Sequence, residues 1–238
     1  MKKLYIYVSL FFLLAIIFFS VNKLKEEKMV EVKETFDSLS VISNSCIKEI
    51  NEENDKSKVL IYYPQTGYEV LDQEITNFIK GIYNDYNKEN AEIGDNIPRQ
   101  SQLLINFDCY EYKDYVSYVF NTSKDILMAH PDQRIHTINY DVKNNKIVTI
   151  KDLVGENPNL LNVLSKYTYE NLSKEKSIIE YGSFDDLKNG TLPTEENYKK
   201  SAFTKTGLLI LFEHYTVGPY VLGEFSLTVP YDKKIKTN

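Results

Sequence analysis

The chain contains 238 residues, of which 28 are basic and 34 are acidic, and its formal net charge is −6 at pH 7. Arginine occurs only at Arg99 and Arg134, so the sequence lacks the basic footprint of a nucleic-acid-binding protein. The two cysteines lack CxxC spacing, which excludes a cysteine-based zinc or redox motif.

The N-terminus carries a membrane-targeting pattern. Lys2 and Lys3 precede an apolar run at residues 4–21, whose length is close to the ~17 residues that a membrane-spanning helix needs. The run ends without the small residues of a cleavage site, which favours an uncleaved anchor over a signal peptide. The lysines then place the N-terminus in the cytoplasm and the rest of the chain outside a cell membrane crossed once. If the segment is cleaved, the protein is secreted instead.

The first predicted elements after this run are a stalk, a hairpin and a helix. Residues 22–35 are charged and predict the stalk. Residues 36–50 and 59–63 predict a hairpin across a polar turn at residues 51–58. Residues 72–88 predict an amphipathic helix, because apolar side chains recur there at intervals of three and four. These side chains are Ile75, Phe78, Ile79, Ile82, Tyr83 and Tyr86.

Two further hairpins follow the helix. Residues 103–110 and 115–122 form one predicted pair of strands, and residues 135–141 and 146–150 form the next. The second of these pairs turns at an Asn-Asn step, a residue type that tolerates left-handed backbone geometry.

The C-terminal part combines helices with a final hairpin. Residues 158–172 predict a second amphipathic helix, and residues 173–194 predict short helical pieces. Thr194 is a predicted N-cap for one more short helix. Residues 208–214 and 220–229 are apolar and β-branched, and the Gly-Pro step between them predicts a tight turn.

Together these elements predict an α+β fold, in which antiparallel hairpins form mixed sheets packed with two main amphipathic helices. The predicted organisation has four segments: an anchor or signal peptide at residues 1–21, a stalk at residues 22–35, an N-terminal subdomain at residues 36–125 and a C-terminal subdomain at residues 126–238.

The cysteines leave two alternatives open. Cys46 and Cys109 both lie in predicted strands. In an oxidising compartment they could form a disulfide, whose long loop would contribute ~4 kcal/mol in the chain-entropy model. Two buried free thiols are the equal alternative, because the sequence does not place the Cα atoms within bonding range.

The candidate ligand contacts are four ring side chains. His130 lies in a predicted loop, and His214, Tyr215 and Tyr220 surround the Gly-Pro step. Tyrosine suits recognition surfaces because it buries area at low entropy cost. Alternatively, the 19 tyrosines reflect base composition, and His214 holds turn carbonyls. His136 lies at the start of a strand, where we expect a half-buried sheet residue.

The sequence provides no convincing catalytic or metal-binding motif. GxSxG, HExxH and Walker patterns are absent. Carboxylates that could serve as a catalytic pair are more often solvated structural groups. The carboxylates considered are Asp108, Glu111, Asp114, Asp141, Asp152 and Glu213.

A family resemblance rests on four blocks of sequence. They are Ala-His-Pro at residues 129–131, TINYD at residues 137–141, IVTIKDL at residues 147–153 and TKTGLLILFEHYTVGPYVLGEFSLTVPY at residues 204–231. These blocks resemble the C-terminal domain shared by lysozyme-sensing RsiV-type anti-sigma factors and PdaC-type peptidoglycan deacetylases. Residues 59–89 resemble the N-terminal partner domain of the same proteins.

The resemblance also implies what the chain lacks. An anti-sigma factor of this type carries a cytoplasmic segment before its membrane helix, and here only residues 1–3 precede the apolar run. A deacetylase of this type adds a domain that binds a metal through Asp and a His-x3-His pair. The three histidines, His130, His136 and His214, do not have that spacing. We therefore expect no catalysis, no metal and no cofactor.

Two functions remain. We expect a membrane-anchored extracytoplasmic domain of the bacterial cell envelope that binds or senses a protein or cell-wall glycan. Without Lys2 and Lys3 the formal charge is −8, which suits a cationic wall hydrolase as partner; a peptidoglycan fragment is the other expected ligand. Residues 4–21 contact the membrane, and no nucleic acid is expected. The alternative is an accessory or cryptic enzyme acting on peptidoglycan or another polysaccharide.

Overall fold

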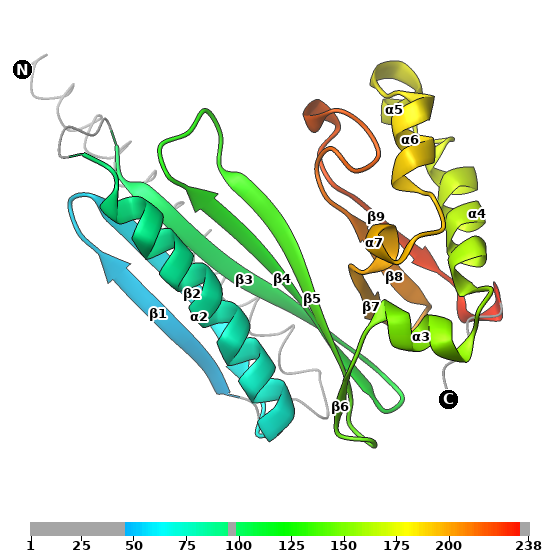
Figure 1. The fold of residues 1–238 in the computed structure, drawn as a ribbon, viewed down its shortest axis with the longest axis horizontal. Helices are drawn as coiled ribbons and strands as arrows, with labels where there is room; N and C mark the ends of the chain where they lie inside the picture. Colours follow the sequence, from blue (N-terminus) through cyan, green and yellow to red (C-terminus); the bar gives the residue numbers. More distant parts are fainter. Residues whose placement is uncertain (1–45, 95–98, 234–238) are drawn as a thin grey trace, which may run out of the picture. The chain divides into compact units, whose positions relative to one another are not determined.

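The computed structural model describes residues 46–94 and 99–233. The predicted anchor or signal peptide, the stalk and the first ten residues of the predicted hairpin lie outside this part of the chain. No helix within it has the length and apolar character needed to cross a membrane. The fold is α+β, as predicted, with a six-stranded mixed sheet and a three-stranded antiparallel sheet (Figure 1).

The six-stranded sheet contains the first three predicted hairpins, and its strands are neighbours in chain order. All pairs are antiparallel except β2 and β3, which run parallel because helix α2 returns the chain along the sheet between them. The predicted subdomain boundary after residue 125 falls between the paired strands β4 and β5, and the two subdomains remain a prediction. The strands are β1 (Cys46–Glu53), β2 (Ser57–Gln65), β3 (Ser101–Tyr112), β4 (Tyr115–Asp125), β5 (Asp132–Asp141) and β6 (Lys146–Val148).

Helix α2 (Glu69–Ala91) confirms the helix predicted at residues 72–88 and lies along the six-stranded sheet (Figure 1). Leu71, Ile75, Ile79 and Tyr86 are buried on its inner face. Each such side chain contributes about 1.5–3 kcal/mol by leaving water. The helix begins where Asp72 accepts hydrogen bonds from the backbone before it, at 2.7 and 3.0 Å.

His136 of β5 is a half-buried sheet residue, as expected, and its ring stacks on Phe78 of α2 with centroids 4.1 Å apart. Burial, and then the charge of Lys200, lower the pKa of His136 to about 4. In the unfolded chain, His136 is therefore protonated as the pH falls through about 6.5, whereas in the folded protein it stays neutral until the pH is lower.

Stability should therefore fall as the pH falls from about 6.5 to 4. Urea denaturation across this range tests the expectation, with His136→Phe as the comparison. The variant should lose a large part of the pH slope; an unchanged slope would assign the dependence to other groups.

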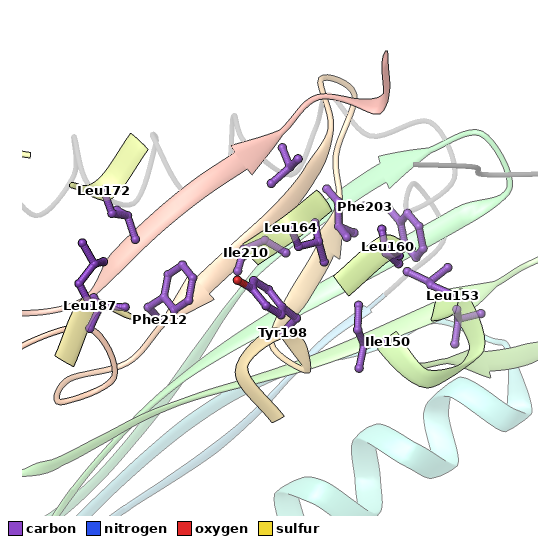
Figure 2. Close-up of a cluster of buried hydrophobic side chains, with 14 of the residues drawn as sticks. Ile150, Leu153, Leu160, Leu164, Leu172, Leu187, Tyr198, Phe203, Ile210 and Phe212 are labelled. Carbon is purple, nitrogen blue, oxygen red and sulfur yellow. The ribbon is translucent and has the colours of Figure 1, made fainter. Parts of the chain in front are cut away.

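The three-stranded sheet and its helices enclose the second core (Figure 2). Leu164, Leu172, Leu187, Ile210 and Phe212 are almost completely buried there. The strands are β7 (Ser201–Phe203), β8 (Leu208–Phe212) and β9 (Phe225–Val229). The helices are α3 (Ile150–Glu156), α4 (Leu160–Leu172), α5 (Lys176–Tyr181), α6 (Phe184–Gly190) and α7 (Glu195–Tyr198).

A buried polar bridge joins the two sheets. The Ser117 hydroxyl of β4 donates to Asn139 Oδ1 of β5 at 2.6 Å and accepts from the Phe203 N–H of β7 at 2.8 Å. Asn139 Nδ2 in turn donates to the Ser201 carbonyl at 2.9 Å. Side chains thus satisfy backbone groups of β7 that face away from its own sheet.

Two predicted elements were wrong in detail. The strand expected to reach residue 150 ends at Val148, because Thr149 and Asp152 form a capping box that starts α3. The final hairpin exists, but residues 213–224 form a long connection instead of a tight turn at the Gly-Pro step. Strand β7 was not predicted, because three residues are too few to show a periodic pattern.

The cysteines are free thiols. Cys46 lies in β1 and Cys109 in β3, with β2 between them. Two strand spacings are ~9.6 Å, which exceeds the ~7 Å limit for the Cα atoms of a disulfide. Cys46 is exposed, whereas Cys109 is partly buried and burial raises its pKa to about 12, which makes it a poor nucleophile.

Candidate functional site

The four predicted contact residues gather around one ring, that of Tyr220. The His130 and His214 rings both stack on Tyr220 with centroid distances of 4.5 Å, at interplanar angles of 24° and 26°. The ring of Tyr215 lies 5.5 Å from that of Tyr220, tilted by 39°. We call these four residues the aromatic cluster. It joins the loop before β5 to the connection at residues 213–224.

The members of the aromatic cluster differ in how they are held. His214 lies two residues after Phe212, the buried end of β8, and its Nδ1 lies 3.5 Å from Glu224 Oε1. His130 is exposed, with Nδ1 3.2 Å from the carbonyl oxygen of Pro131. Tyr215 has a φ of 64°, a left-handed conformation that is uncommon for a side-chain-bearing residue, and is 66% exposed. The cluster therefore presents the Tyr215 ring to solvent, beside a half-buried Tyr220 ring on which two histidines stack.

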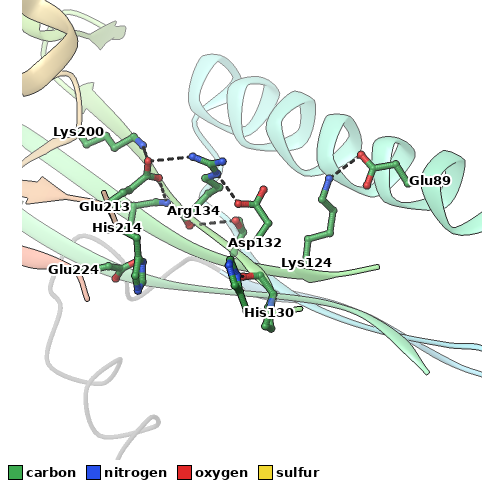
Figure 3. Close-up of polar contacts among 12 residues, drawn as sticks. Glu89, Lys124, His130, Asp132, Arg134, Lys200, Glu213, His214 and Glu224 are labelled. Atoms are coloured by element: carbon green, nitrogen blue, oxygen red, sulfur yellow. Dashed lines mark hydrogen bonds and ion pairs between the residues drawn. The ribbon is translucent and has the colours of Figure 1, made fainter. Parts of the chain in front are cut away.

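Glu213 links the start of the connection at residues 213–224 to β5 through a hydrogen bond and an ion pair. Its Oε1 accepts the Ile135 N–H at 2.6 Å, and its Oε2 pairs with Lys200 and lies 3.8 Å from Arg134 Nη1 (Figure 3). The Arg134 Nε in turn contacts Asp132 at 2.9 Å. The sequence singled out Glu213 only as one carboxylate among six. Its partner Ile135 lies 78 positions upstream, so no local pattern shows this role.

Close backbone packing fixes the rest of the connection. Gly190, the last residue of α6, lies so near the connection that a Cβ there would be 2.0 Å from the Thr216 carbonyl oxygen. Val217, which follows Thr216 in the connection, is only 2% exposed. The aromatic cluster consequently sits on a segment anchored on both sides of Tyr215.

Exposed apolar side chains adjoin the aromatic cluster. The 3-10 turn at Tyr220–Leu222 contacts α5, and Val221 in this turn is 79% exposed. Exposed apolar side chains that gather within a polar surrounding are typical of interaction surfaces. Their neighbours on α5 and the start of α6 are also exposed: Ile179, Tyr181 and Phe184.

Two more of the candidate catalytic carboxylates, Asp141 and Asp152, have structural roles, whereas Oε1 of Glu111 is buried without a hydrogen-bond partner. Asp141 accepts from the backbone N–H and the side-chain amide of Asn144, at 2.9 and 2.7 Å. Asp152 accepts from Thr149 in the capping box, and these hydrogen bonds lower its pKa. Burial raises the pKa of Asp108, which accepts a long hydrogen bond of 3.4 Å from Asn121 Nδ2. Among the described residues, no three Asp, Glu, His or Cys side chains are grouped closely enough to hold a metal ion.

Comparison with known proteins agrees with the resemblance. Residues 151–232 match the family described as Protein of unknown function (DUF3298). The chain is 27% identical over 216 residues to the peptidoglycan-N-acetylmuramic acid deacetylase PdaC of Bacillus subtilis. The match covers 89% of this chain but only 45% of that protein, so the chain spans less than half of its relative's length.

Two crystal structures share the fold. A DUF3298 family protein from Pseudomonas aeruginosa superposes with a TM-score of 0.59 at 13% identity, covering 80% of this chain and 90% of that one. A DUF3298 family member from Bacteroides fragilis superposes with a TM-score of 0.52 at 14% identity, covering 79% and 90%. The family match and the likeness to PdaC support a PdaC-like DUF3298 domain in this chain, and the two crystal structures share its fold.

Proposed function

We propose that the chain is a membrane-anchored extracytoplasmic domain that binds or senses a protein or cell-wall glycan of the bacterial envelope without catalysing its turnover. The observation that carries the proposal is the convergence of His130, His214 and Tyr215 on Tyr220 from two distant segments. Exposed tyrosines on a rigid support are typical of recognition surfaces, because they lose little entropy on binding.

Charge and similarity support the choice of partner. The chain has a net charge of −6, which attracts a basic protein such as a cationic wall hydrolase. PdaC is named as a peptidoglycan deacetylase, so a peptidoglycan fragment is the second candidate ligand. Both ligands belong to the outer face of the membrane, where the predicted anchor at residues 4–21 would hold the domain.

Calorimetric titration of the full chain in detergent, with lysozyme as a basic wall hydrolase and with muropeptides, tests the proposal. Tyr220→Ala should weaken binding roughly tenfold or more, as expected at the centre of an interface. Tyr220→Phe, which keeps the stacked ring, should retain most of the affinity.

Tyr169→Ala is the matched control, because Tyr169 lies on α4 and is 37% exposed. Equal affinities for the Tyr220→Ala and Tyr169→Ala variants would reject the aromatic cluster as the binding site. Release of acetate or of reducing ends from peptidoglycan would contradict the non-catalytic function and favour the enzyme alternative.

A further inference from the structure

A separate pocket of about 480 Å3 lies where β5, α6, α7 and β8 meet. Its volume is within the range of roughly 300–1,000 Å3 that is usual for small-molecule sites. The members of the aromatic cluster do not line it. The charged side chains that line it are Arg134, Glu196, Lys199, Lys200 and Glu213.

The carboxylate of Glu213 is already satisfied within the protein. It accepts the buried Ile135 N–H and pairs with Lys200, and its side chain is only 10% exposed. A buried carboxylate with these partners has little capacity left for a ligand cation. The lining carries three basic and two acidic side chains, within a chain whose net charge is negative.

Two cationic groups remain accessible in the pocket. Lys199 pairs with Glu196 at 2.5 Å, but both side chains are largely exposed, at 51% and 75%. Such exposed surface pairs are weak, so a ligand oxyanion can replace Glu196. The side chain of Arg134 pairs with Asp132 through Nε at 2.9 Å but is 63% exposed, and the other donors of its guanidinium suit carboxylates and phosphates.

We propose that this pocket binds the carboxylate or phosphate group of a small acidic ligand. Lys199 and Arg134 supply the charged donors, and Asn189 adds an amide at the rim. The inference does not depend on the aromatic cluster, because the two sites use different side chains.

NMR titration of the full chain in detergent tests this inference with three probes. The first probe, N-acetylmuramic acid, carries one carboxylate. The second, N-acetylglucosamine, is the corresponding neutral sugar, without the group that bears the carboxylate. The third, inorganic phosphate, tests whether the pocket binds a phosphate instead of a carboxylate. We expect saturable shifts at Lys199 and Arg134 with at least one of the two anions. Their absence with both anions, or equal shifts with the neutral sugar, would overturn the proposal.

Two substitutions should have opposite effects. Lys199→Gln should weaken anion binding about tenfold, because it removes a charge-assisted hydrogen bond. Glu196→Gln should strengthen it about threefold, because it removes the competitor for Lys199. A substitution effect that came only from disturbed structure would not weaken anion binding in one variant and strengthen it in the other.

The controls separate this site from the proposed function. Lys205→Gln makes the same change of net charge in the exposed turn between β7 and β8, and should leave the affinity unchanged. Tyr220→Ala should also leave anion binding unchanged. Equal weakening by Lys199→Gln and Lys205→Gln would reject the pocket in favour of a general charge effect.

Discussion

Replacing Phe212 with Ala should lower the free energy of unfolding by about 3–5 kcal/mol. Phe212 ends β8 with 0% exposure, and its ring meets that of Tyr198 edge-on at 6.3 Å. The surrounding cluster comes from both a sheet and several helices, so it cannot collapse easily onto the cavity left behind (Figure 2). Urea denaturation followed by far-UV circular dichroism measures the loss.

Phe184→Ala provides the matched control. Phe184 begins α6 and is 55% exposed, so the same truncation there should cost less than about 1 kcal/mol. If both variants lost equal stability, Phe212 would not belong to a packed core.

The second large effect is expected for Gly190→Ala, which should destabilise the protein by about 1–3 kcal/mol. A Cβ at this position would lie 2.0 Å from the Thr216 carbonyl oxygen, which is backbone and can move only with its segment. The whole connection at residues 213–224 must therefore shift. The rings of Tyr215 and Tyr220 should lose their contact, and ligand affinity at the aromatic cluster should fall together with stability.

Gly81→Ala tests whether the effect is specific to the contact. Gly81 lies in α2 with no atom within 4 Å of the position of an added Cβ. The substitution should stabilise the protein by about 0.4–1 kcal/mol, because Ala has the higher helix propensity and fewer unfolded conformations. Destabilisation at both positions would show that the close approach of Gly190 to Thr216 is not the cause.

Local patterns in the sequence predicted most of the fold. The period of α2 was clear because one face of a long helix is buried, and Leu71, Ile75 and Ile79 repeat along it. The error at Ile150 arose because IVTI reads as a strand, although Thr149 and Asp152 already carried the capping signal for α3. The connection after β8 was read as a tight turn because its anchors, at Ile135 and Gly190, are distant in sequence.

The candidate site could be predicted only in part. Loop position and ring chemistry were sufficient to select His130, His214, Tyr215 and Tyr220, but nothing local implies that rings ninety positions apart stack. The role of Glu213 was missed for the same physical reason, since a carboxylate becomes an anchor only when folding brings a backbone N–H and a cation to it.

The polar bridge between the two sheets determines which parts of this chain form one structural unit. The matched segment, residues 151–232, contains β7 and the connection but not Ser117, His130 or Ile135. A fragment cut at those boundaries would expose the Phe203 N–H and the Glu213 carboxylate where each now has a buried partner. It would also lack one of the two imidazoles that flank Tyr220. In this chain the matched segment therefore depends on residues far upstream, and the six-stranded sheet completes the packing of its polar groups.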